Sequence, residues 1–318
     1  MAGSPIPRPL DVSLIVIAYN ERDRGPSAVR AILGQDGKAT FEVVFVDDGS
    51  IDGTAEAVTA AADGDKRFRL IRLPDNRGRG AARQAGVEAA RGRAIGFVDA
   101  DITLPPDWLR RCLEELPGNA AVGGTPVPNS DAAAVARISG AVPRERTSIM
   151  PITGSNVLFD ADVFAHAGFD PGDRMGEDTR FAARLLAEGH QLRRIRGLFV
   201  RHDDGRTYLQ ALRWRFENGI DASSLPRELR AVRASDISWI GWLSATVLAL
   251  GAGVAGSPGW LLLWPAATVT VAVIHTWTRF QTRPIGSFVV ACLVDVPLVL
   301  AYLAGRTAGI PRLIRGRR

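Results

Sequence analysis

Several residue types and motifs are scarce in this chain, and each absence narrows the class of protein. The 318 residues include two cysteines, Cys112 and Cys292, which are remote in sequence, so no disulfide framework is expected. The first residues lack a basic segment followed by an apolar one, so we expect no signal peptide and a cytosolic N-terminal domain. No basic stretch interleaved with aromatic residues is present, which argues against nucleic acid as a partner.

Charge is missing from two long stretches near the C-terminal end. Residues 237–256 and 259–278 contain no Asp, Glu, Lys or Arg, and each has about the 20 residues that a helix needs to cross a bilayer. Residues 286–304 form a third apolar stretch, interrupted by Asp295 and Pro297, which either crosses or re-enters the membrane. We therefore expect a membrane anchor, with a buried helical hairpin as the alternative.

The charge distribution supports this division of the chain. The net charge of +5 comes from arginines, several of them close to the apolar stretches, where they favour contact with anionic membrane lipids. The predicted parts are a cytosolic domain over 1–236, an anchor over 237–304 that makes this a multi-pass cell-membrane protein, and a basic tail over 305–318.

Strand and helix patterns alternate through the N-terminal part. Apolar runs typical of buried strands occupy 12–18, 41–46, 68–73 and 94–98, and helical patterns follow at 26–35, 53–62 and 80–90. Nearly all-apolar strands alternating with helices predict an α/β fold whose parallel sheet is covered on both faces.

The positions of the glycines and acids then restrict the class of ligand that this fold is expected to bind. Gly78 and Gly80 follow the third strand and lack the last glycine of G-x-G-x-x-G, and no G-x-x-x-x-G-K-[ST] exists. A dinucleotide fold and a P-loop are therefore disfavoured. Instead, Asp48 ends the second strand and the pair Asp99 and Asp101 ends the fourth. Such a D-x-D can hold a divalent cation together with nucleotide phosphates, although a solvated turn is the alternative.

Four segments in order carry a resemblance. Residues 17–21, 46–54, 76–83 and 97–101 resemble the family 2 glycosyltransferases, and the likeness extends over 12–220. It implies a GT-A fold, a Rossmann-like nucleotide-sugar-binding domain, with Mg²⁺ or Mn²⁺ as cofactor. By this resemblance the donor-binding residues are Ala18, Tyr19, Glu21, Asp48, Arg79, Arg83 and Asp99, and the metal ligands are Asp99, Asp101 and His202. For either arginine, a solvated charge at a helix start is the alternative.

Two acids in the second half are candidates for catalysis. Residues 153–156 form a polar turn before a strand, and Glu177 and Asp178 begin a helix. Acids at a helix N-terminus also stabilise the helix. In the family, the matching "E-D" acids supply the base that removes the proton of the acceptor hydroxyl. The resemblance implies that Asp178 is this base, with Glu177 as the next candidate.

A Q-x-x-R-W motif completes the site prediction. Gln210, Arg213 and Trp214 match it, and in family members that build long polysaccharides these residues line the acceptor end of the site. An amphipathic helix explains the neighbouring apolar residues equally well.

The leading functional prediction is a membrane-bound inverting glycosyltransferase. It transfers a sugar from a nucleotide-diphosphate donor to a lipid-linked or cell-envelope acceptor, and membrane lipids are its other partners. A short processive polysaccharide synthase is the alternative favoured by Q-x-x-R-W and opposed by the few apolar spans. A non-catalytic membrane scaffold that retains the fold is the alternative from another class.

Overall fold

The protein is described here from a computed structural model. The described residues are 8–128, 142–143, 154–165, 167–173, 176–203, 207–223, 234–254, 263–281 and 285–311. The chain forms two compact units, the first comprising 1–129 and 145–204 and the second 130–144 and 205–318. Residues 205–236, which the sequence analysis assigns to the catalytic domain, thus belong to the second unit.

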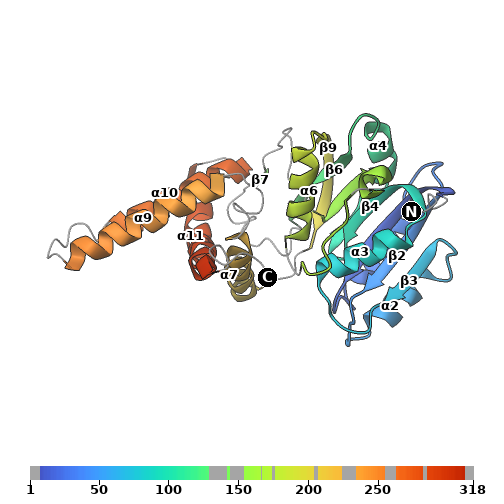
Figure 1. Ribbon diagram of the computed structural model, residues 1–318, viewed down its shortest axis with the longest axis horizontal. Helices are drawn as coiled ribbons and strands as arrows, with labels where there is room; N and C mark the ends of the chain where they lie inside the picture. The colour runs from blue at the N-terminus through green and yellow to red at the C-terminus, as the bar shows by residue number, and fades with distance from the viewer. Residues whose placement is uncertain are drawn as a thin grey trace, which may run out of the picture. The chain divides into compact units, whose positions relative to one another are not determined.

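The first unit contains one sheet of eight strands (Figure 1), in the order β3-β2-β1-β4-β8-β6-β9-β5. The strands are β1 (Leu10–Ala18), β2 (Phe41–Asp47), β3 (Phe68–Arg72), β4 (Gly92–Asp99), β5 (Ile102–Thr103), β6 (Ala121–Pro128), β8 (Asn156–Asp160) and β9 (Leu192–His202). Strands β1 to β4 are mutually parallel, as predicted. The prediction of an all-parallel sheet is wrong beyond β4, because β8 runs antiparallel to both β4 and β6.

Helices cover both faces of this sheet. They are α1 (Gly25–Leu33), α2 (Thr54–Ala62), α3 (Arg79–Ala89), α4 (Trp108–Glu115), the 3₁₀-helix η1 (Ala161–Ala165) and α6 (Glu177–Ala187). Alternate residues of β1 enter two separate apolar cores: Leu14 packs with residues of α1, α2 and α4, and Ile15 with residues of α3 and α6. Two-sided burial explains why the strands are apolar without alternation.

The second unit is mainly helical. It contains α7 (Tyr208–Ala222), α9 (Ala234–Val254), α10 (Leu263–Arg279) and α11 (Ile285–Ala308), with a short antiparallel pair of β7 (Val142–Pro143) and β10 (Phe280–Gln281). Helix α11 continues through Pro297 and includes Arg306, which is buried and paired with Asp236 at 2.5 Å. The start of the predicted basic tail is therefore helical, while 312–318 lie outside the described residues.

The predicted membrane spans find no support in the described residues. Helices α9, α10 and α11 occupy the three apolar stretches, yet none of the described helices is both long and apolar enough to cross a bilayer. Helix α10, for example, has 17 residues, where a crossing takes about 20.

Candidate active site

A cavity of about 400 Å³ lies where β1, β2 and β4 end. Ligands of open α/β sheets bind at the carboxyl ends of the strands, so this is the expected place for a donor. The cavity is lined by Ile17, Ala18, Tyr19, Glu21, Asp48, Asn76, Gly78, Arg79, Ala82, Asp99, Ala100 and Asp101. All of the predicted donor-binding residues except Arg83 are in this lining.

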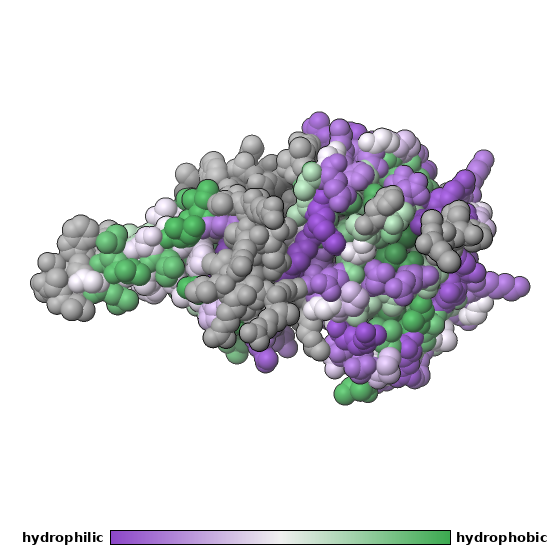
Figure 2. Space-filling view, in the orientation of Figure 1, coloured by the Kyte–Doolittle hydropathy of each residue, from purple (hydrophilic) through white to green (hydrophobic). Residues whose placement is uncertain are grey.

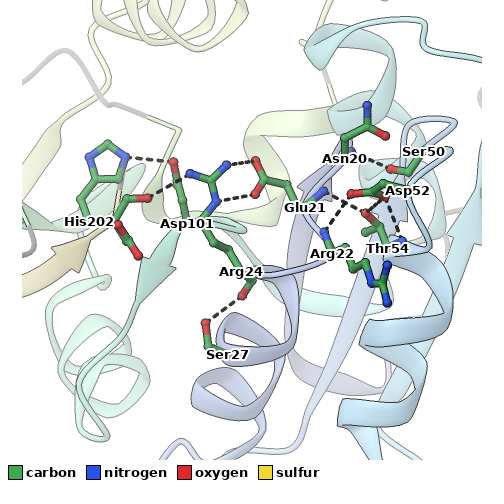
Figure 3. Close-up of polar contacts among 11 residues, drawn as sticks. Asn20, Glu21, Arg22, Arg24, Ser27, Ser50, Asp52, Thr54, Asp101 and His202 are labelled. Atoms are coloured by element: carbon green, nitrogen blue, oxygen red, sulfur yellow. Dashed lines mark hydrogen bonds and ion pairs between the residues drawn. The ribbon is translucent and has the colours of Figure 1, made fainter. Parts of the chain in front are cut away.

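The segments that follow β1 and β2 are hydrogen-bonded to each other beside the cavity (Figure 3). The backbone N–H of Asn20 donates to Ser50 Oγ at 2.9 Å, and the N–H of Glu21 donates to Thr54 Oγ1 at 2.8 Å. Asn20 has a left-handed φ of 56°, which asparagine tolerates better than most residues. Its side chain accepts from the N–H of Ile51 at 3.1 Å. These bonds fix the wall of the cavity that Tyr19 and Glu21 line.

Asp48 holds the loop that precedes α3. Its two carboxylate oxygens accept from the backbone N–H groups of Arg77 at 2.9 Å and Gly78 at 2.8 Å. The next residue, Arg79, is exposed and begins α3 at the cavity. An arginine at a helix N-terminus, beside backbone N–H groups, suits a phosphate.

Asp101 and His202 come together although they are far apart in the sequence. The short strand β5 pairs with β9 so that Ile102 lies opposite His202, and the N–H of Asp203 donates to the carbonyl of Asp101 at 2.8 Å. His202 Nε2 then lies 3.1 Å from Asp101 Oδ2 (Figure 3). Among the described residues, no hydrogen bond reaches the buried Oδ1 of Asp101.

The electrostatics of Asp101 favour its ionised form. Burial alone would raise the pKa of this carboxyl, but the hydrogen bond and charge of His202 lower it below the usual range, and the charges of Arg24 and Arg79 act in the same direction. Asp101, a residue of the cavity lining, is thus a negatively charged group at this edge of the sheet.

Arg24 is a site residue that the sequence analysis missed. From the start of α1 its guanidinium pairs with both carboxylate oxygens of Glu21, at 2.7 and 2.9 Å, and reaches the carbonyl of Asp203 at 3.4 Å (Figure 3). Burial raises the pKa of Glu21, and Arg24 counters part of that effect. The sequence does contain a signal for this pair, because an acid and an arginine three positions apart can pair at the start of a helix.

Arg83, Asp99 and Glu177 form a buried ion network. The Arg83 side chain is 1% exposed and pairs with Asp99 at 3.1 Å and with Glu177 at 2.9 Å. Burial raises the pKa of Glu177 despite the opposing charge of Arg83. The predicted contact of Arg83 with a diphosphate conflicts with this geometry, because the guanidinium is enclosed by protein partners.

The two candidate bases differ in access. Glu177 is buried against Arg83, whereas Asp178 is half-buried and accepts from the N–H of Gly154 at 2.8 Å. The N-cap residue of helix α6 is Gly176, but Asp178 Oδ1 accepts from the backbone N–H of Thr179 in the first turn at 2.6 Å. The capping alternative is thus realised in part at Asp178. Residue 153 of the predicted polar turn lies outside the described residues.

The predicted metal ligands do not form a ready-made metal centre. In the part of the chain that the structure describes, no group of three or more His, Cys, Asp or Glu side chains could hold a metal ion. Asp99 Oδ1 pairs with Arg83 at 3.1 Å, and Asp101 and His202 lie next to each other.

The Q-x-x-R-W residues lie on α7 in the second unit, and each of the three has a local structural partner. Gln210 completes a capping box with Thr207, and Arg213 pairs with Glu217 at 2.9 Å. The ring of Trp214 lies under the guanidinium of Arg215, 5.5 Å away. Their acceptor role stays a prediction.

The fold is similar to that of solved glycosyltransferases. A mannosyltransferase from Pyrobaculum calidifontis, solved with GDP-Man and Mn²⁺, superposes with a TM-score of 0.67 at 20% identity, covering 99% of this chain and 92% of that one. Together with the acid-lined cavity at the strand ends, this defines a GT-A-like α/β fold.

The sequence comparison gives the family. The family model described as Glycosyl transferase family 2 matches residues 13–174, more than half of the 318 residues, and the chain belongs to this family. The succinoglycan biosynthesis protein ExoO of Rhizobium meliloti (strain 1021) is 38% identical over 199 residues, 56% of each chain. An undecaprenyl-phosphate 4-deoxy-4-formamido-L-arabinose transferase of Pseudomonas aeruginosa is 38% identical over 133 residues, 40% of this chain and 39% of the relative. The chain thus spans about half the length of these relatives or less.

Proposed function

We propose that the protein is an inverting glycosyltransferase that moves a sugar from a nucleotide-diphosphate donor to a lipid-linked or cell-envelope acceptor. The observation that carries this proposal is the cavity at the strand ends, where Asp48, Arg79 and Asp101 line one space. Carboxylates accept from ribose and base groups, and the exposed arginine matches the charge of a diphosphate.

In the proposed reaction Asp178 is the general base. It removes the proton of the acceptor hydroxyl while that oxygen forms a bond to the anomeric carbon of the sugar. The bond between this carbon and the diphosphate oxygen breaks on the opposite face, and the nucleoside diphosphate leaves. Glu177 does not serve as the base in this scheme, because its carboxylate is buried against Arg83.

Asp101 and His202 are the residues that would hold Mg²⁺ or Mn²⁺. Asp101 offers a buried oxygen that no described residue satisfies, and His202 lies next to it. A hard cation needs few protein ligands where donor phosphates complete its shell, and it stabilises the charge on the departing diphosphate. Asp99, at the end of β4, faces the same cavity.

A separate set of observations supports the proposed acceptor and location. The named substrate of the Pseudomonas relative is a lipid phosphate, and helix α9 exposes large apolar side chains (Figure 2), namely Ile237, Ile240, Val247, Leu248 and Leu250. A helix that is apolar all round suits a lipid environment. We therefore place the protein at the cell membrane, with its catalytic unit in the cytosol. Sedimentation of the full chain with membranes in high salt tests this, since release by salt alone would contradict apolar attachment.

A nucleotide-release assay tests the reaction. Purified full-length protein is incubated with a panel of nucleotide sugars and Mn²⁺, and the free nucleoside diphosphate is measured, with EDTA and the variant Asp178→Asn as controls. We expect metal-dependent release with one donor class. Absence of release with every donor, in the presence of candidate lipid phosphates, would favour a non-catalytic scaffold. Products that lengthen with time would favour the polysaccharide synthase.

A further inference from the structure

Arg83 occupies an unusual position for an arginine next to a nucleotide-sugar cavity. Its guanidinium uses all three nitrogens on protein acceptors: Nε donates to Glu177 Oε1 at 2.9 Å, Nη1 to the carbonyl of Gly154 at 3.0 Å and Nη2 to Asp99 Oδ1 at 3.1 Å. The ring of Phe97 lies 5.0 Å from the guanidinium carbon. The side chain is enclosed, so it can reach a ligand only through its partners.

These partners belong to three separate segments of the first unit. Asp99 ends β4, Gly154 lies in the turn before β8, and Glu177 begins α6. One planar guanidinium joins all three segments, which the single nitrogen of a lysine cannot do in the same way. Arg83 thereby links the donor side of the cavity to the helix that carries Asp178.

Gly154 connects this network to Asp178. Its carbonyl accepts from Arg83, and its N–H donates to Asp178 Oδ2 at 2.8 Å. A Cβ atom at position 154 would lie 2.4 Å from Arg83 Nη2, so a side chain there would displace the guanidinium. The turn and the arginine are therefore fitted to each other, and a continuous path of bonds runs from Asp99 to Asp178.

We propose that Arg83 is a positioning residue, which holds the donor-side Asp99 and the base Asp178 in a fixed mutual geometry through Glu177 and the peptide groups of Gly154. The proposal rests on the proposed function, in which Asp178 is the base. Glu177 serves as the structural partner of Arg83, and contact with the diphosphate falls to the exposed Arg79.

The first test compares Arg83→Lys with the matched control Arg91→Lys, which alters a half-exposed arginine that pairs with Glu42 outside the cavity. We expect Arg83→Lys to lower kcat by about 100-fold, since small misplacement of catalytic groups has effects of that size. The Kd of the nucleoside diphosphate with Mn²⁺, measured by calorimetry, should rise less than about tenfold. Arg91→Lys should leave kcat per folded molecule unchanged. A large rise in Kd with unchanged kcat would overturn the proposal in favour of phosphate contact.

A double-mutant cycle asks whether Arg83 acts through Asp178. If it does, Arg83→Lys combined with Asp178→Asn should be hardly slower than Asp178→Asn alone, because residues that act as a unit are non-additive. If the kcat losses of the two single variants multiply in the double variant, the two residues act independently and the proposal is overturned. A purely structural role would lower the folded fraction and leave kcat per folded molecule intact, which also contradicts the proposal.

Hydrogen exchange keeps the proposal testable independently of activity. In Arg83→Lys the amides of 154–156 and 177–181 should exchange faster than in wild type, while Arg91→Lys should not affect them. Unchanged exchange in both segments would overturn the positioning role whether or not the protein transfers sugar. Failure of wild type to release any nucleotide would instead contradict the proposed function and leave this exchange result standing.

Discussion

The first unit contains two buried ion networks at opposite ends of its parallel strands, and they are built in opposite ways. Near the start of β2, one carboxylate, Glu42, serves two arginines: Arg69 at 2.8 Å and Arg91 at 2.7 Å. Beyond the end of β4, one arginine, Arg83, serves two carboxylates. Both central side chains are almost fully buried, so the difference between the networks lies in how completely their atoms are bonded.

The network at Glu42 is complete. One carboxylate oxygen accepts from Ser13 Oγ and from the N–H of Arg91, and the other accepts from both arginines. At the opposite end, Oε2 of Glu177 and Oδ1 of Asp101 are buried, and no hydrogen bond reaches them among the described residues. Buried polar atoms are normally bonded, and exceptions mark functional positions. Under the proposed function, the complete network serves stability and the incomplete one lies beside the reacting groups.

The largest expected effect comes from Asp178, at the incomplete end. Asp178→Asn retains one oxygen that can accept from Gly154 but loses the acceptor of the Thr179 N–H, so the free energy of unfolding should fall by about 1 kcal/mol. It removes the proton acceptor, and loss of a general base typically costs about 10² to 10⁴ in rate. We expect kcat to fall by that factor while calorimetry shows unchanged donor affinity. Transfer at close to the wild-type rate would assign the base to another residue.

The next effect concerns Glu42, at the complete end. Its hydrogen bonds with the arginines and Ser13 outweigh burial and lower the pKa of the carboxyl from 4.5 to about 2. Such a shift corresponds to on the order of 3 kcal/mol. Glu42→Gln should lower the free energy of unfolding in urea at pH 7 by that order, with kcat per folded molecule unchanged. A loss of kcat in the folded variant would remove the distinction between the two ends.

The same carboxyl gives a pH dependence. Because the pKa of Glu42 is lower in the folded protein, its contribution is fully present above about pH 4.5 and is lost as the pH falls toward 2. Urea unfolding between pH 5 and pH 3 should show wild type losing more stability than Glu42→Gln. Parallel curves for the two proteins would show that Glu42 does not carry this effect.

The sequence predicted the parallel half of the first unit well, and the reason is local. Strands β1, β2 and β4 are mostly apolar, with single polar residues such as Glu42 near their starts. Their ends are marked by acids, so Asp48, Asp99 and Asp101 could be placed at one edge of the sheet. Strand β9 is different, because Leu192–His202 contains several arginines that hide its strand character. Its pairing with β6 and β5 is long-range and leaves no local signal.

Arg83 shows a second limit of sequence reasoning. A guanidinium binds carboxylate and phosphate with the same planar geometry, so its position near a nucleotide motif could not distinguish a ligand phosphate from Asp99 and Glu177. Only the burial of the Arg83 side chain, which the structure shows, identifies the protein carboxylates as its partners instead of a ligand phosphate. The predicted membrane spans are a related case. The uncharged stretches coincide with helices α9, α10 and α11, but no helix among the described residues is long and apolar enough to cross a bilayer.

A moderate effect is expected at Asp101, which lines the cavity and has one buried oxygen that no described residue bonds. Asp101→Asn should keep the fold and weaken binding of the nucleoside diphosphate in the presence of Mn²⁺ by about 10 to 100-fold, the usual range for disturbed metal sites. Binding measured in EDTA should change far less. Equal affinities of variant and wild type in Mn²⁺ would contradict the metal assignment.

The smallest effect is expected at Arg213, outside both networks. Its side chain is 83% exposed and pairs with Glu217 within one helix, and such pairs contribute less than about 0.5 kcal/mol. Arg213→Gln should therefore leave the urea midpoint nearly unchanged. If Arg213 nevertheless contacts the acceptor, the KM for acceptor should rise with donor KM unaltered, which steady-state kinetics would detect.

The pairing of β5 with the end of β9 has a consequence for synthesis of the protein on the ribosome. The segment that matches the family model ends at residue 174, and a nascent chain of that length already contains Asp48, Asp99 and Asp101. It lacks Asp178 and His202, which arrive with α6 and with the last residue of β9. Under the proposed function, the residues that bind nucleotide are thus made first, and the base and His202 join them only after α6 and β9 have been synthesised.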